Sequence, residues 1–71
     1  MNVSFRQGEE IDRVFFDHEY VGYIQDEILY GFNHHNYAEE IGSVVNRSQA
    51  ASKLKKYRRN LMFKQAREKL K

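Results

Sequence analysis

The residues with the clearest chemical potential are cations near the carboxyl end of the chain. Together with one aromatic residue they share the outward face of a helix when each residue advances by about 100°, and they are Lys55, Lys56, Arg59, Phe63 and Arg67. Cations on one exposed face neutralise phosphates, because each contact releases condensed counterions. The Phe63 ring suits stacking on a base or docking into a protein pocket. This face is the predicted contact surface for nucleic acid or for a protein partner.

Other patterns point away from catalysis and from metal binding. His18, His34 and His35 do not have the i, i+4 spacing of a hydrolytic zinc site, and the chain has no Cys. The neighbouring carboxylates in Glu9–Glu10 and Glu39–Glu40 point apart on a strand or a helix, so they are poor acid–base pairs. A nucleophile elbow and a glycine-rich phosphate loop are both absent from the sequence. We therefore expect no enzyme activity, no cofactor and no metal.

The charges are divided unequally along the chain. Residues 1–46 carry two basic and nine acidic side chains, a net charge of −7, whereas residues 47–71 carry ten basic and one acidic, a net charge of +9; the two give the overall +2. Such asymmetry is typical of a surface for nucleic acid or an acidic partner. The alternative is that the basic segment is neutralised by the acidic one within the fold. The acidic part also predicts an acidic exposed sheet.

Length and composition limit the protein class. A chain of 71 residues is expected to form one domain, and without Cys it must rely on its apolar core. No run is apolar enough for a signal peptide or a membrane span, so we expect a soluble, cytoplasmic protein with no membrane partner. The small size suggests a bacterial or phage origin, in which case a phage-encoded chain would act in the cytoplasm of its bacterial host.

The basic residues lie on one long predicted helix that begins after Asn46. Its first half has an apolar stripe at helical spacing, formed by Ala50, Leu54, Tyr57 and Leu61. Asn46 is suited to cap the helix, and Gln49 can reach back as in a capping box. No Gly or Pro interrupts residues 47–71. On this helix Lys53, Arg58 and Lys64 flank the stripe and are expected to extend over it.

The remaining chain predicts an α+β fold with a three- or four-stranded antiparallel sheet, packed by the one long C-terminal helix. The candidate strands are residues 2–7, 13–17, 20–25, 28–33 and 40–45. Residues 28–33 also fit a helix that begins at Val21, although their aromatic and β-branched content favours a strand. Gly22 indicates a bulge or a close backbone approach.

A sheet of such short strands covers only about 13 to 15 helical residues. The predicted compact domain is therefore residues 1–61, followed by a basic extension, residues 62–71, that is helical or frayed. Apolar residues in this extension lie opposite the stripe and offer a homodimer contact; they are Phe63, Ala66 and Leu70.

Two resemblances accompany this interpretation. The segments 20–24 (YVGYI) and 42–54 (GSVVNRSQAASKL) resemble small phage and mobile-element proteins, in which an antiparallel sheet precedes one alanine-containing helix. The same architecture is similar to amino-terminal DNA-binding domains of some integrases, which read the major groove with the sheet. Because the sheet here is expected to be acidic, the helix would meet DNA instead. Alternatively, Ala38, Ile41 and Gly42 followed by residues 48–54 resemble a helix-turn-helix.

The resulting hypothesis is a non-enzymatic binding module that regulates gene expression through nucleic acid, with Lys55, Lys56 and Arg59 as phosphate contacts. The rival hypothesis is a phage-type regulator that binds a host protein assembly such as RNA polymerase through its charged surfaces, with Phe63 as an anchor. A third is a structural subunit or homodimer.

Overall fold

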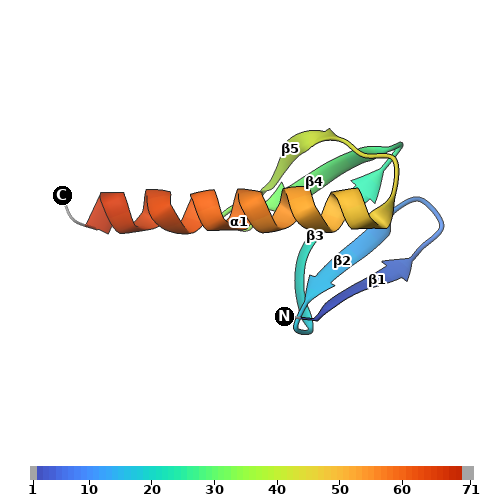
Figure 1. Cartoon of the computed structure of the whole chain (residues 1–71), viewed down its shortest axis with the longest axis horizontal. Coiled ribbons are helices and arrows are strands. Elements are labelled where there is room, and N and C mark those ends of the chain that lie inside the picture. Colours follow the sequence, from blue (N-terminus) through green and yellow to red (C-terminus); the bar gives the residue numbers. More distant parts are fainter. Residues whose placement is uncertain (1, 70–71) are drawn as a thin grey trace.

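The computed structural model describes residues 2–69, with side chains through Lys64. Five antiparallel strands precede one helix: β1 (Val3–Gln7), β2 (Asp12–Phe16), β3 (Glu19–Gln25), β4 (Ile28–Phe32), β5 (Ala38–Ser43) and α1 (Arg47–Lys69) (Figure 1). Each strand pairs with its neighbours in sequence, so the sheet is a simple meander. The predicted α+β class is confirmed, but the predicted count of three or four strands is wrong, because five are formed within the described residues.

The last strand excludes the helix-turn-helix alternative. Ala38–Ser43 is not a helix but pairs with β4, with Phe32 opposite Ala38 and Tyr30 opposite Glu40. The residues that would form the first helix of that motif are therefore held in the sheet. Ile28–Phe32 is likewise a strand, which resolves the ambiguity between strand and helix at this segment.

Two tight turns connect the central strands. Asp17 and His18 between β2 and β3 have φ values of 49° and 73°, and Asp26 and Glu27 between β3 and β4 have 51° and 64°. Two successive positive φ values are typical of hairpin turns whose twist matches the flanking strands. The Glu27 carbonyl also accepts a hydrogen bond of 2.8 Å from the Val44 amide, which ties this turn to the segment entering α1.

The start of α1 is capped as its sequence predicts. The Asn46 side-chain oxygen accepts a hydrogen bond of 2.7 Å from the Gln49 amide. The Gln49 side-chain oxygen in turn accepts one of 2.8 Å from the Val45 amide, immediately before the cap. The first bond satisfies a backbone donor that the first turn of a helix would otherwise leave unpaired. The second goes to Val45, one residue before the Asn46 amide that a capping box would use, and it fixes the segment that enters the helix.

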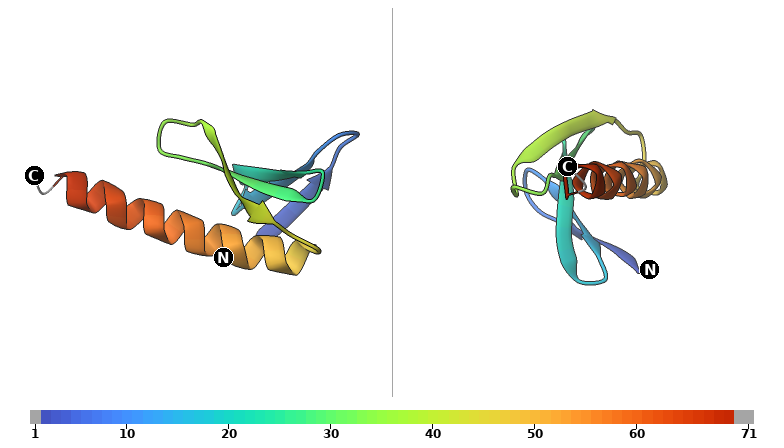
Figure 2. Two further views of the ribbon diagram at one scale, coloured as in Figure 1. Left: turned by 90° about the horizontal axis from the view of Figure 1, so that it is seen from above. Right: turned by 90° about the vertical axis from the view of Figure 1, so that its left-hand side faces the viewer.

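The core lies between one face of the sheet and the first half of α1. Its buried side chains come from β2, β3, β4, the β5–α1 connection and the helix, and they are Val14, Phe16, Val21, Leu29, Val44, Ala50 and Leu54. Figure 2 shows the helix on one side of the sheet, with its carboxyl-terminal part extending past the strands. The helix continues without interruption through Lys69, giving a molecule 43 Å long and about 20 Å across (extents 43 × 22 × 19 Å).

Close packing of α1 depends on two glycines that are cross-strand partners in the pairing of β3 with β4. A Cβ atom on Gly31 would lie 2.8 Å from the Ile41 side chain and 2.9 Å from both Leu54 and Tyr57. A Cβ on its partner Gly22 would collide with the Tyr30 carbonyl oxygen and lie 3.2 Å from Leu54. Leu54 therefore rests directly on the sheet backbone. The close approach predicted at Gly22 is confirmed.

We expect Gly31→Ala to reduce the free energy of unfolding by about 1–3 kcal/mol, because the added methyl group overpacks the contact with Leu54 and Tyr57. Denaturant unfolding of four proteins provides the measurement: the parent, Gly31→Ala, Leu54→Ala and the double variant. Because Leu54→Ala removes one of the crowded groups, Gly31→Ala should cost less in that background. Equal costs in the two backgrounds would contradict the proposed crowding.

Candidate binding surface on the basic helix

Three of the helix cations are used to attach α1 to the sheet. Arg47 pairs with Asp12, with Nε 3.1 Å from the carboxylate. Arg58 pairs with Glu19 at 3.7 Å, and Lys53 donates a hydrogen bond of 2.8 Å to the Ser43 carbonyl. The predicted extension of Lys53 and Arg58 over the edges of the packed face is confirmed by these contacts.

The predicted contact residues have a different environment. Lys55, Lys56 and Arg59 are exposed, and no ion pair joins them to another residue in the described part of the chain. Phe63, one turn beyond Arg59, is 64% exposed. The side chain of Arg67 lies outside the described residues, although its backbone belongs to α1.

The structure brings only some of these cations together. Lys55 and Arg59 line a groove beside the β2–β3 turn, whereas Lys56 lines a separate hollow on the β5 side with Ile41, Tyr57 and other residues. The predicted cations therefore lie on two sides of α1, with Lys55 and Arg59 on one side and Lys56 on the other. Of the proposed dimer residues, Phe63 is described and exposed, whereas the side chain of Ala66 and all of Leu70 lie outside the described residues.

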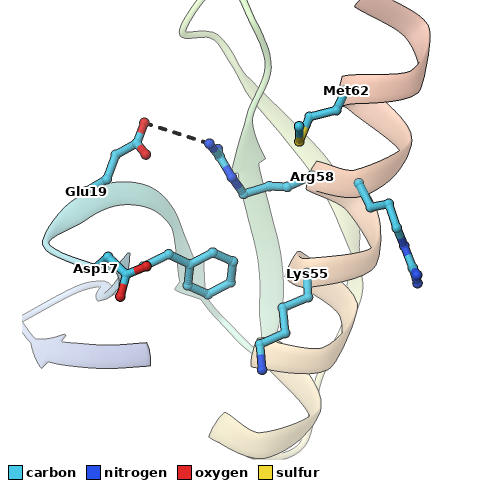
Figure 3. Close-up of a pocket in the computed structure, with 7 residues that line it drawn as sticks. Asp17, Glu19, Lys55, Arg58 and Met62 are labelled. Atoms are coloured by element: carbon cyan, nitrogen blue, oxygen red, sulfur yellow. Dashed lines mark ion pairs between the residues drawn. The ribbon is translucent and has the colours of Figure 1, made fainter. Parts of the chain in front are cut away.

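The groove between α1 and the β2–β3 turn has a volume of about 680 Å³. Its lining residues come from both elements, and they are Phe16, Asp17, Glu19, Lys55, Arg58, Arg59 and Met62. Figure 3 shows the acidic residues Asp17 and Glu19 on one side and Lys55 and Arg58 on the helix side, with the Arg58–Glu19 ion pair crossing between them. The groove thus has an apolar part and oppositely charged walls.

Met62 lines this groove although it is not among the contact residues predicted from the sequence. Met62 is 70% exposed even though it is a large apolar residue. The signal was present in the helical pattern, because Met62 lies one turn beyond Arg58 but outside the apolar stripe. Exposure of such a side chain next to paired charges makes it a contact residue for the groove.

The expectation of an acidic exposed sheet face is wrong. Asp12 and Glu19 pair with cations of α1, and Glu39 lies near Tyr57 on the helix side. Other carboxylates of the first half occupy the turns between strands, at Glu9, Glu10, Asp17, Asp26 and Glu27. The face of the sheet away from α1 instead carries aromatic rings.

Glu39 lies between the β4–β5 loop and Tyr57 of the helix. Asn33 donates a hydrogen bond of 2.9 Å to its carboxylate, and the Asn33 side-chain oxygen accepts bonds from the amides of His35 and Tyr37. The bond from Asn33, followed by the nearby Tyr57 hydroxyl, lowers the pKa of Glu39. Burial, followed by the Glu39 carboxylate, raises the pKa of Tyr57 to about 12.

The Tyr57 hydroxyl is buried and completes no hydrogen bond with the residues that the structure describes. Its effect on the pKa of Glu39 is weaker than that of the direct bond from Asn33. His34 and His35 have ring centroids 4.0 Å apart in the same loop. Among the side chains that the structure describes, which end at Lys64, no three of His, Cys, Asp or Glu gather in a way that would hold a metal ion.

Comparisons of the chain with protein-family models, with curated proteins and with solved structures find no match. The resemblance to phage and mobile-element proteins therefore stays a prediction. Across the described residues, α1 is too polar to serve as a membrane-spanning helix.

The lowered pKa of Glu39 predicts a specific acid sensitivity. Its contribution to stability should be complete above its ordinary pKa of 4.5 and be lost as the pH falls through the lower value of the folded state. Glu39→Gln should therefore flatten the dependence of the free energy of unfolding on pH below about 4.5. Glu40→Gln, which removes the neighbouring carboxylate of β5, is the control. Superimposable pH profiles for parent and Glu39→Gln would contradict this assignment.

Proposed function

We propose that this chain is a non-enzymatic binding module that regulates gene expression by contacting nucleic acid through α1. Lys55, Lys56 and Arg59 are the phosphate contacts, and Phe63 and Arg67 extend the surface along the projecting end of the helix. The chemistry is neutralisation of phosphate charge with release of counterions, which requires exposed cations and no catalytic group.

One observation carries the proposal: the helix uses some of its cations internally and leaves others exposed. Residues 47–64 contain seven basic and no acidic side chains. Arg47 and Arg58 are paired with carboxylates of the sheet, whereas Lys55, Lys56 and Arg59 are exposed without a carboxylate partner among the described residues. The carboxyl-terminal part of α1 extends past the strands (Figure 1), whereas Lys55 and Arg59 lie beside the β2–β3 turn with Asp17 and Glu19.

The mixed lining of the groove supports a second candidate function, a regulator that binds a host protein assembly such as RNA polymerase. Met62 is an exposed apolar side chain in the groove, and Asp17 and Glu19 place negative charge beside it. Phe63, the next residue of α1, is also exposed. Aromatic and Met side chains next to complementary charges are typical of protein interfaces, whereas phosphate is repelled by carboxylates. In this candidate the groove, and not the outer face of α1, carries the contact.

For the leading proposal, affinity for a short DNA duplex should fall steeply with salt. Three phosphate contacts correspond to a slope of about −2.7 in log affinity against log salt concentration, at about −0.9 for each contact. The double variant Lys55→Gln/Arg59→Gln should reduce the magnitude of this slope by about 1.8. Fluorescence anisotropy over a range of salt concentrations gives both values.

The matched control is Arg47→Gln/Lys53→Gln, which removes two charges from the same helix at positions that already contact the sheet. It should leave the slope nearly unchanged, after circular dichroism has established that both double variants are folded. Equal slopes for the two double variants, or no binding by the parent, would contradict phosphate contact at Lys55 and Arg59.

The second candidate predicts capture of a protein assembly from bacterial lysate after nuclease treatment. Met62→Ser should abolish this capture because it removes the exposed apolar side chain of the groove, whereas Lys56→Gln, on the other side of the helix, should leave it intact. Loss of all captured protein after nuclease treatment would exclude this candidate and favour contact through nucleic acid.

A further inference from the structure

The sheet face away from α1 carries a continuous layer of aromatic side chains. Side chains alternate between the two faces of a strand. Because Gly22 and Gly31 face Leu54 of the helix, their neighbours in β3 and β4 point the other way. The aromatic residues on this opposite face come from β2, β3 and β4, and they are Phe15, Tyr20, Tyr23, Tyr30 and Phe32.

These rings contact one another across three strands. Tyr23 stacks on Tyr30 with centroids 4.9 Å apart, and Phe15 stacks on Tyr20 at 5.3 Å. Phe32 joins the two pairs, because its ring lies 4.9 Å from Tyr20 and 6.0 Å from Tyr23. All five rings remain partly exposed. Within residues 2–69, α1 packs against the opposite face (Figure 2), and it approaches the layer only at the end of the sheet, beside Tyr20 and Phe32.

Two arginines lie at the β1–β2 side of the layer. Arg6 is directly opposite Arg13 in the antiparallel register, and like charges in this position destabilise a sheet. The Arg6 guanidinium is 5.7 Å from the centre of the Phe15 ring, which places it on the aromatic face. Neither arginine forms an ion pair with a residue that the structure describes. An anion between them would relieve their repulsion.

Most carboxylates of the strands lie on the other face of the sheet, so the β1–β2 side of the aromatic face, with Arg6 and Arg13, is positively charged. Asp12, Glu19 and Glu39 are directed to the helix side, and of the described strand residues only Glu40, opposite Tyr30 in β5, places an acid on the aromatic face. The combination of exposed rings with nearby cations matches the requirements of single-stranded nucleic acid, whose bases need π faces and whose phosphates need positive charge.

We propose that this face binds single-stranded nucleic acid. Bases stack on the Tyr23–Tyr30 pair and on the adjoining rings, while Arg6 and Arg13 contact the backbone phosphates. A base-paired duplex cannot use the layer in this way, because its bases are already stacked within the helix. The inference concerns a different face from the contacts of α1, so either assignment can fail while the other holds.

The first test compares two probes with the same number of phosphates, a short oligothymidylate and an abasic oligomer of equal length. Stacking predicts that the parent protein binds the oligothymidylate at least tenfold more tightly, because the abasic backbone offers no base to the rings. Equal affinities would overturn the proposal and leave only charge attraction.

The second test locates the contact. Tyr23→Leu preserves an apolar strand residue but removes the π face, and it should weaken oligothymidylate binding about tenfold. Arg13→Gln should reduce the magnitude of the salt slope by about 0.7, the value for one phosphate of a single strand. Lys53→Gln, which alters a helix cation already bonded to the Ser43 carbonyl, is the matched control and should leave both properties nearly unchanged. A loss of binding in Lys53→Gln as large as that in Tyr23→Leu would overturn the assignment to the sheet.

A third variant keeps the test valid if Tyr23→Leu does not fold. The chain has no Trp, so Tyr23→Trp introduces a single indole fluorophore within the layer. Its fluorescence should be quenched on addition of oligothymidylate, and its affinity should equal or exceed that of the parent. No quenching would overturn the proposal. A doubled molecular mass in solution, accompanied by a change in the indole emission as the protein concentration rises, would also overturn it and identify a second copy of this chain as the occupant.

Discussion

The contact of the Leu54 side chain with Gly22 and Gly31 positions α1 relative to the sheet. Gly22 and Gly31 face each other across β3 and β4, and the absence of side chains there lets Leu54 reach the sheet backbone. A helix held this close has one possible packed face, with Tyr57 one turn further along. Since the strands are short, the same contact also determines that the following half of the helix extends beyond them.

Charge pairing refines this arrangement without being its main source of stability. Arg47–Asp12 and Arg58–Glu19 are partly exposed pairs, and such pairs typically contribute less than about 1 kcal/mol. Their greater consequence is the position that they give to the strand carboxylates. They draw the strand carboxylates to the edges of α1, so the strongly acidic first part of the chain does not neutralise the outward cations of the helix. The opposite charges of the two halves thus remain partly separated in the folded protein.

The sequence predicted the elements whose local signals agree, and failed where pairing determines the structure. The cap at Asn46 and the long helix follow from local chemistry. By contrast, the sequence predicts the last strand at residues 40–45, whereas Ala38–Ser43 forms it. This strand contains Ala, Glu and Gly, residue types that are depleted in strands, and its position is determined by pairing with β4. Irregular pairing at Val14/Phe15 and Leu29/Tyr30 also breaks the simple alternation of faces. Composition therefore gave the wrong character for the exposed sheet, whose aromatic layer depends on register.

The aromatic layer and the basic helix come close at the end of the sheet, although they occupy different faces. There Tyr20 and Phe32 share a small hollow with Arg58, Leu61 and Met62. The two surfaces bind by different interactions. Phosphate contacts weaken as the salt concentration rises, because added salt reduces the free energy gained from counterion release. Stacking instead requires unpaired bases. A nucleic acid that uses both must therefore offer a flexible single strand next to a backbone of high charge density. A nucleic acid without bases could still contact the cations of α1, and one without phosphate charge could still stack on the aromatic layer. The contributions of the two surfaces can therefore be measured separately.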